Sequence, residues 1–280
     1  MRAVIVFLAL TTFACDRNKQ PLPIDDTIQP AAITFDGTDY QAAAAKSAHG
    51  ERLSRVLGCR GCHGDGLVGQ LWDNDPKGFG VMWASNLTRA VPTMTDQQFR
   101  DLMVKGRHPR RPDLWVMPSE MFQHLAQRDL DAIIAYLRTL PPVGEISPDP
   151  KLGPLAISQA KTGEVKAAAL LVRDRRDQLP IDAGAATAQG RYMATVTCAE
   201  CHGPRLDGQK SPEGSTPDLN TAAAYSRAEF EQLITRGVAT GGRKLHPLMQ
   251  SVAKGRFAHL TPRERNELYA YLKARAEQPQ

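Results

Sequence analysis

The sequence has little of several features that mark common classes of protein. Aromatic residues make up only 6% of the 280 residues, and cysteine occurs just five times. Lysine and arginine are dispersed among carboxylates and the net charge is only +5, so the chain has no basic stripe for binding nucleic acid. We also find no acid–base or nucleophile constellation of the kind that covalent catalysis needs. The few cysteines carry the strongest pattern.

Four of the five cysteines lie in two copies of the pattern C-x-x-C-H, at residues 59–63 and 198–202. This pattern is the attachment site of a c-type haem. Two thiols one helical turn apart point the same way and can add to the vinyl groups of one porphyrin edge, while the next histidine can bind the iron. The sequence therefore predicts two covalently bound haem c groups. The expected attachment and ligand residues are Cys59, Cys62 and His63 in the first copy and Cys198, Cys201 and His202 in the second.

A zinc site and a redox pair fit the paired cysteines less well than haem attachment does. Two C-x-x-C pairs that share a zinc ion usually lie about 15–20 residues apart. Here Cys59 and Cys198 are 139 positions apart (198 − 59), and zinc leaves both histidines unexplained. A thioredoxin-like redox pair needs strand–helix–strand surroundings, and the flanking sequence has no strand-rich pattern.

The two motifs belong to an internal repeat. Residues 62–70 read CHGDGLVGQ and residues 201–209 read CHGPRLDGQ. Further along, the same residue types recur at a constant offset of 131: Phe99, Leu102 and Gly106 match Phe230, Leu233 and Gly237. Capping boxes predict where three helices begin, at Thr95 with Gln98, Ser226 with Glu229 and Thr261 with Glu264. Each half is thus expected to be helix, haem loop, helix, loop, helix, which makes the fold class all-α.

Prolines and apolar patterns divide the chain into five expected parts. Residues 44–141 and 184–280 are the two predicted haem domains, and the prolines near 141–154 mark the boundary between them. The linker at 142–183 contains an amphipathic pattern at 161–178, which predicts a helix that packs across one or both domains.

The N-terminus is typical of an exported protein. Residues 1–14 combine a charged start with a short apolar run, which predicts a signal peptide cleaved after Ala14. The next residue, Cys15, resembles the lipidated cysteine of a bacterial lipoprotein, although Thr12 stands where leucine is usual. We expect a lipid on Cys15, a tether at 15–43 and a periplasmic protein held at the membrane.

Each iron needs a sixth ligand, and methionine is the candidate in both halves. Met117 lies eleven residues after Gly106 (117 − 106), and Met249 lies twelve after Gly237 (249 − 237). We therefore expect His63 with Met117, and His202 with Met249. The alternatives left open are Met121 and the histidines His108, His124, His246 and His259, of which His246 is the strongest.

Cationic and aromatic residues near these methionines give weaker signals. Basic pairs at 110–111 and 243–244 precede the two methionines, so either they bind haem propionates or they are solvated loops. Trp72, Trp83 and Trp115 have no counterparts in the second half. We expect them to pack within the longer loop of the first half rather than wall the haem.

These residues resemble class I cytochrome c domains, here two in tandem over roughly 44–141 and 184–277. The first half is similar to domains in the cytochrome subunits of periplasmic alcohol and aldehyde dehydrogenases, in its SNLT at 85–88, its Met-Pro at 117–118 and its 129–143 segment. Those subunits usually carry three haems, whereas this chain has two motifs, and its second half lacks the proline after the methionine.

The resemblance implies an exported dihaem electron carrier that is not itself an enzyme. Its expected partners are a periplasmic dehydrogenase as donor and an oxidase, a quinone oxidoreductase or another cytochrome as acceptor. A different class is a dihaem enzyme, such as a cytochrome c peroxidase or a thiosulfate dehydrogenase, which needs an iron with a labile or absent sixth ligand. A candidate methionine in each half favours the carrier.

Overall fold

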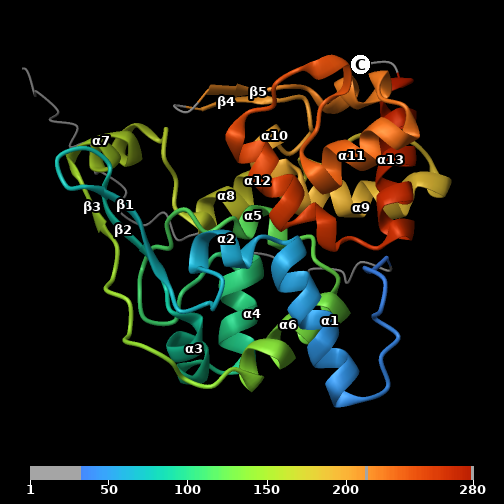
Figure 1. The fold of residues 1–280 in the computed structure, drawn as a ribbon. Helices are drawn as coiled ribbons and strands as arrows, with labels where there is room; N and C mark the ends of the chain where they lie inside the picture. The colour runs from blue at the N-terminus through green and yellow to red at the C-terminus, as the bar shows by residue number, and fades with distance from the viewer. Residues whose placement is uncertain (1–32, 212–213, 279–280) are drawn as a thin grey trace, which may run out of the picture.

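The computed structural model describes residues 33–211 and 214–278, and it is mostly helical (Figure 1). The predicted signal peptide at 1–14, Cys15 and much of the predicted tether lie outside these residues. Within the described ranges, no helix combines the length and the apolar character needed to cross a membrane. In Figure 1 the second half of the chain, orange to red, lies above the first half, blue to green.

The elements follow one another in three groups. The first half contains α1 (Ala43–Val56), α2 (Cys59–His63), β1 (Gln70–Asp75), β2 (Gly80–Ala84), α3 (Leu87–Ala90), η1 (Val91–Thr93), α4 (Asp96–Lys105), α5 (Ser119–Phe122) and α6 (Gln127–Thr139). The linker contains β3 (Lys151–Leu152), α7 (Pro154–Thr162) and α8 (Ala168–Arg175). The second half contains η2 (Ala185–Thr187), α9 (Ala188–Thr197), α10 (Ala199–His202), β4 (Gln209–Ser211), β5 (Gly214–Thr216), η3 (Leu219–Ala224), α11 (Arg227–Arg236), η4 (Thr240–Gly242), α12 (Pro247–Gly255), η5 (Phe257–His259) and α13 (Pro262–Ala276).

The two halves repeat the same order of helices. α1 and α9 lead into the cysteine motifs, α2 and α10 carry them, and α6 and α13 close the halves. All three predicted capping boxes are present, at the starts of α4, α11 and α13. The helix α6 begins after Ala126 without a side-chain cap, as its sequence predicts.

Short strands correct the all-α prediction. β1, β2 and β3 form a three-stranded antiparallel sheet, and β4 and β5 form a hairpin. β1 reads QLWDND and is mostly exposed, so it lacks the alternation of apolar and polar residues that identifies a strand. Backbone pairing with β2, interrupted by a bulge between Leu71 and Asp73, defines it instead.

The linker forms two helices rather than the single helix predicted at 161–178. α7 ends before Gly163, whose φ of 78° is the left-handed conformation that commonly terminates helices. α8 then packs against α4 and α5 of the first half. Its Val172 carbonyl accepts a hydrogen bond from Gln123 Nε2 at 3.2 Å, which fixes the linker to that half.

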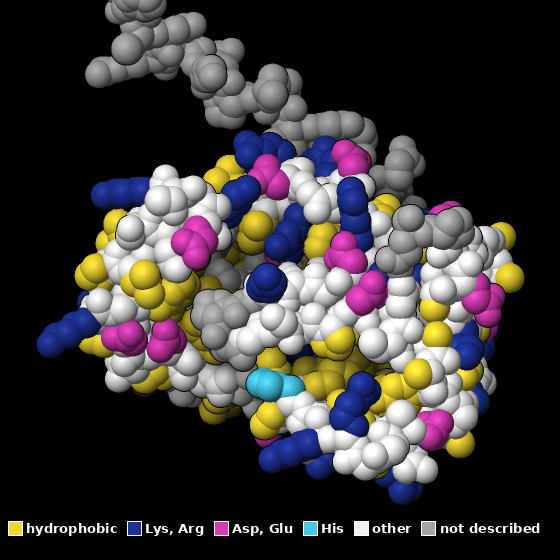
Figure 2. All heavy atoms as spheres, turned by 90° about the horizontal axis from the view of Figure 1, so that it is seen from above, with side chains coloured by type: hydrophobic (Ala, Val, Ile, Leu, Met, Phe, Trp, Pro, Cys, Tyr) yellow, Lys and Arg dark blue, Asp and Glu magenta, His cyan; other side chains and the backbone are white. Residues whose placement is uncertain are grey.

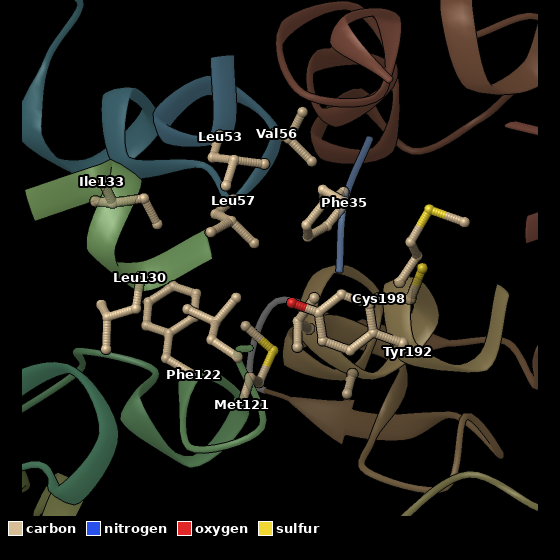
Figure 3. Close-up of a cluster of buried hydrophobic side chains, with 14 of the residues drawn as sticks. Phe35, Leu53, Val56, Leu57, Met121, Phe122, Leu130, Ile133, Tyr192 and Cys198 are labelled. Carbon is tan, nitrogen blue, oxygen red and sulfur yellow. The ribbon is translucent and has the colours of Figure 1, made fainter. Parts of the chain in front are cut away.

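One buried hydrophobic cluster runs through both halves. It joins Leu53, Phe122 and Ile133 of the first half to Tyr192 and Cys198 of the second (Figure 3). Phe35 lies between them, is only 1% exposed, and has its ring 5.4 Å from that of Tyr192. Residues 33–42 were predicted as part of a tether, but Phe35 and Thr38 of this segment are buried. The sequence gives no sign of this burial, because a single buried aromatic residue leaves no periodic pattern.

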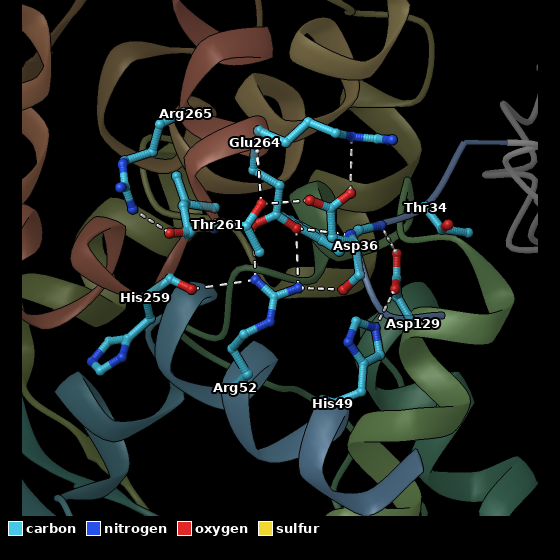
Figure 4. A network of polar contacts seen from close by, with 12 residues as sticks. Thr34, Asp36, His49, Arg52, Asp129, His259, Thr261, Glu264 and Arg265 are labelled. Atoms are coloured by element: carbon cyan, nitrogen blue, oxygen red, sulfur yellow. Dashed lines mark hydrogen bonds and ion pairs between the residues drawn. The ribbon is translucent and has the colours of Figure 1, made fainter. Parts of the chain in front are cut away.

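Two buried carboxylates hold this segment in place (Figure 4). Asp129 of α6 accepts from Phe35 N at 3.0 Å, and Glu264 of α13 accepts from Asp36 N at 2.8 Å. Both carboxylates are the third residue of the closing helix of their half, and both are fully buried.

Each of these carboxylates also reaches across to the other half. Glu264 pairs with Arg52 Nη1 of α1 at 2.8 Å, and Asp129 accepts from the Tyr192 hydroxyl of α9 at 2.8 Å. His49 adds a bond to Asp129 at 2.9 Å. Buried carboxylates require such partners, so these contacts bind the halves together.

Candidate functional site

Each cysteine motif opens into its own cavity. The first cavity has a volume of about 390 Å³ and contains Cys59, Cys62 and His63 in its lining. The second has a volume of about 340 Å³ and is lined by Thr197, Cys198, Cys201 and His202 among others. Both volumes fall in the range of cofactor sites, which is roughly 300–1,000 Å³.

The face of the molecule seen from above in Figure 2 is hollowed. Figure 2 shows a hollow with a hydrophobic floor, and a histidine and lysine or arginine side chains stand at its rim. Side chains of these types line the second cavity, namely Arg243, Lys244 and His246. The site therefore combines an apolar interior with a cationic mouth.

The same hydrogen bonds shape the loop after each motif. Leu67 and Leu206 are fully buried and have φ of 57° and 63°, a left-handed conformation that non-glycine residues rarely adopt. The N–H of each donates to the glycine carbonyl three residues before it, and each carbonyl accepts from the N–H of the first residue of a later helix, Leu87 of α3 or Leu219 of η3. Such strained residues cluster at functional sites, and here the strain occurs at matching positions in both halves.

A glutamine side chain secures each motif helix. Gln70 Nε2 donates to Gly61 O at 2.8 Å, and Gln209 Nε2 donates to Glu200 O at 2.8 Å. The repeat shows both glutamines in the sequence, but nothing in it indicates their role, because the acceptor is a backbone carbonyl inside the motif.

A backbone carbonyl orients the histidine of each motif. His63 Nδ1 donates to Ser85 O at 2.7 Å, and His202 Nδ1 donates to Pro217 O at 2.8 Å. Burial lowers the pKa of both rings, so they are neutral, and the proton on Nδ1 leaves the lone pair on Nε2. This arrangement is typical of a histidine that binds a metal through Nε2.

The thiols suit neither a redox pair nor a shared zinc site. Burial raises the pKa of Cys59 and of Cys198 to about 11, whereas redox-active thiols have lowered pKa values. No disulfide links the four cysteines that the structure describes. Nor do three or more His, Cys, Asp or Glu side chains gather into a metal-binding group anywhere in 33–211 or 214–278, which disfavours a shared zinc site.

The two predicted methionines both lie at their cavities. Met117 lines the first cavity from the loop before α5, and Met249 lines the second from the first turn of α12. Val116, directly before Met117, has φ of 67°, which is unfavourable for a β-branched residue. Its strain fixes the backbone at the point where Met117 meets the cavity.

The alternative ligands separate into two groups. Met121 is 3% exposed and belongs to the hydrophobic cluster shared by the halves (Figure 3), and it does not line the first cavity. His124 and His259 line neither cavity. His108 lines the first cavity and His246 the second, so these two remain geometric alternatives to the methionines.

Three of the four predicted cationic residues also lie at the cavities. Arg111 lines the first, and Arg243 and Lys244 line the second, while Arg110 lines neither. Arg111 Nε is buried without a hydrogen-bond partner. Burial also lowers the pKa of Arg111, so an anionic group in the cavity would be a favourable partner.

The sequence led us to expect that the tryptophans pack within the loop of the first half, but the structure places them at the first cavity. All three line the first cavity, and Trp72 is 44% exposed at its edge. The antiparallel pairing of β1 with β2 brings Trp72 and Trp83 there, because it folds the longer loop back over the cavity. The position of these tryptophans was therefore missed for the same reason as the sheet, because nothing in the sequence indicates that β1 pairs with β2.

The first cavity includes two residues from the second half. These are Glu200, within the second motif, and Arg256, which lines both cavities. All the residues that line the second cavity, in contrast, come from the second half. Sequence reasoning missed Arg256, because it lies after α12, far from either motif in the chain.

The comparisons with known proteins bear on the second half. Residues 186–276 match the family model described as cytochrome c. This part of the chain is a cytochrome c domain. The match includes His202 and Met249 and lies inside the domain predicted at 184–280. A search of curated proteins found no match to the chain.

The cytochrome c domain implies electron transfer through a haem c, and its residues fit that group. The motif would attach the porphyrin through Cys198 and Cys201, and Nε2 of His202 is free of the Pro217 hydrogen bond and available to iron. The cavity walls are largely apolar, and Arg243 and Lys244 could bind the propionates. When bound, the haem supplies one-electron redox chemistry.

Proposed function

We propose that the protein is a dihaem electron carrier, with a second haem c in the first half. The main support is the repetition of the whole site. In both halves a carbonyl holds the histidine Nδ1, a buried left-handed leucine shapes the loop, and a glutamine braces the motif helix. A loop without a haem would not need this strained and specific arrangement.

His63 with Met117, and His202 with Met249, are the proposed iron ligands. Each pair lines one cavity, and each histidine has a neutral ring with Nε2 available. The chain's part is to fix these ligands, to surround the porphyrin with apolar side chains and to exclude water. Methionine as sixth ligand raises the reduction potential and leaves no open position for substrate, which suits a carrier.

The proposed setting is the periplasm, with the protein held at the membrane by a lipid on Cys15. The charged and apolar start of the chain supports export, and covalent haem attachment takes place outside the cytoplasm. The proposed donor is a periplasmic dehydrogenase. The proposed acceptor is an oxidase, a quinone oxidoreductase or a cytochrome.

A potentiometric titration of the purified full-length protein, followed by optical and low-temperature magnetic spectra, tests the carrier function. We expect two haems per chain, each low-spin with histidine and methionine ligands. Met117→Leu and Met249→Leu should each lower one potential, on the order of 0.1 V within the roughly 0.8 V range that axial ligands span. Met121→Leu is the matched control and should leave both potentials unchanged.

Carbon monoxide distinguishes the carrier from a dihaem enzyme. We expect the reduced wild-type protein to bind it slowly, because both irons have six ligands. Rapid, high-affinity binding at one haem would contradict the carrier and favour an enzyme with an open iron site.

A further inference from the structure

Arg256 lies where the two halves meet. It follows the last residue of α12 and precedes η5, and its backbone N–H donates to Val252 O at 2.8 Å. Its side chain lines both cavities and is 16% exposed. A single guanidinium is therefore close to both proposed haem sites.

The guanidinium is held between the two cysteine motifs. Arg256 Nη1 pairs with Glu200 Oε2 at 2.7 Å, and Glu200 stands between Cys198 and Cys201. On the other side the guanidinium lies against Gly58, directly before Cys59. A Cβ atom at Gly58 would come within 2.1 Å of Arg256 Cζ, so a larger residue at this position would displace the guanidinium.

The Arg256 side chain stays charged in this position. Burial opposes the charge, but the attraction of the Glu200 carboxylate and its hydrogen bond raise the pKa of Arg256. A charge that is largely shielded from water acts over a longer distance than a surface charge.

We propose that the Arg256–Glu200 pair jointly sets the reduction potentials of the two haems. This inference rests on the proposed dihaem function. Reduction adds one negative charge to a haem, so Arg256 favours the reduced state of both haems and Glu200 opposes it. The pair would therefore couple the two sites through one shared element.

Charge-neutralising variants of the full-length dihaem protein test the proposal. Arg256→Gln should lower both potentials, and Glu200→Gln should raise both. Removing a charge that lines both cavities should change the equilibrium constant for reduction of each haem about tenfold. This corresponds to a shift in potential of about 59 mV for a one-electron couple. The double variant should lie near the wild type, because the two effects have opposite signs.

Two further variants serve as controls. Arg256→Lys keeps the charge and should keep both potentials near those of the wild type. Arg243→Gln removes a cation that lines only the second cavity, so it should lower one potential and leave the other in place.

The outcomes separate this inference from the proposed function. A haem-to-protein ratio of one in the wild type would overturn the dihaem function itself. The shared role of the pair alone would be overturned if the protein carries two haems but both variants, Arg256→Gln and Glu200→Gln, leave the potentials unchanged. It would also be overturned if both variants shift the potential of only one haem. Because Glu200→Gln predicts a shift of opposite sign, the proposal stays testable even if Arg256→Gln does not fold.

Discussion

The two halves of the molecule share one plan around the cysteine motif and differ in what surrounds it. The second site is lined entirely by its own half, whereas the first has three tryptophans and two residues borrowed from the second half. The loop between the motif histidine and the next helix is also longer in the first half. Leu87 lies 24 positions after His63 (87 − 63), whereas Leu219 lies 17 positions after His202 (219 − 202). The motif loop is thus the constant part, and the walls are the variable part.

This difference has a consequence for how the halves depend on each other. The second half can complete its own cavity, but the first half needs Glu200 and Arg256 for part of its wall. Residues 186–276, which contain every residue that lines the second cavity, are also those that match the cytochrome c family model. We therefore expect the two sites to respond unequally when either one is disrupted.

The largest effect should come from removing one pair of attachment cysteines. Cys59→Ala with Cys62→Ala, and separately Cys198→Ala with Cys201→Ala, should each reduce covalent haem from two groups per chain to one. Loss of the second haem should also shift the spectrum and potential of the first, because the first cavity borrows from α10 and from the end of α12. Loss of the first haem should leave the second nearly unchanged.

Haem-to-protein ratios and redox titrations measure this asymmetry. An equal disturbance of the remaining haem in both variants would show that the borrowed wall does not matter. The wild-type protein, produced in the same maturation system, provides the reference ratio.

An intermediate effect is expected where the halves are joined. Asp129→Ala and Glu264→Ala each remove a fully buried carboxylate and leave buried donors without a partner. Each should lower the free energy of unfolding by about 3 kcal/mol. Denaturant titration monitored by circular dichroism gives the values.

The matched control is an exposed ion pair in the same protein. Asp96 pairs with Arg138 at 2.8 Å on the surface, and Asp96→Ala should cost about 1 kcal/mol or less. If the three variants lost the same stability, the buried contacts between the halves would be no stronger than a surface pair.

The smallest effect concerns the capping boxes of α4 and α11, which differ in charge at their third helical residue. Hydrogen bonds from Ser226 and Thr240 lower the pKa of Glu229 to about 2, from its ordinary value of 4.5, while the first half has the uncharged Gln98. The contribution of Glu229 to stability is complete above pH 4.5 and disappears as the pH falls towards 2.

Glu229→Gln makes the second half like the first in this respect. The difference in unfolding free energy between the wild type and this variant should shrink as the pH falls from 4.5 to about 2. Gln98→Glu should introduce the same pH dependence into the first half, because the new carboxylate would occupy the position in α4 that Glu229 has in α11. A difference that stays constant over this range would contradict the assigned role of Glu229.

Local signals in the sequence predicted much of the site. The motif spacing and the three capping boxes depend on contacts within a few residues. The positions of Met117 and Met249 were predicted from their distance after Gly106 and Gly237 in the repeat, and both residues line the cavities. The ligand role of the methionines stays a prediction. Helix order followed from the repeat, because a repeated sequence forms the same local structure twice.

Contacts between distant parts of the chain could not be predicted in this way. β1 is a polar, exposed strand that only its partner defines, and the buried Phe35 contacts the ring of Tyr192, 157 positions away (192 − 35). Arg256 carries no local pattern at all, because its role depends on Gly58 and Glu200 being brought together by the packing of the halves.

The hydrophobic cluster that runs through both halves determines how the molecule melts. Since Phe35 and Tyr192 belong to a core that neither half completes alone, the two halves cannot lose their structure independently. Calorimetry should record a single cooperative transition, and a fragment that begins after the linker would expose an apolar surface and aggregate. Although the chain contains two similar halves, we expect it to unfold as one cooperative unit.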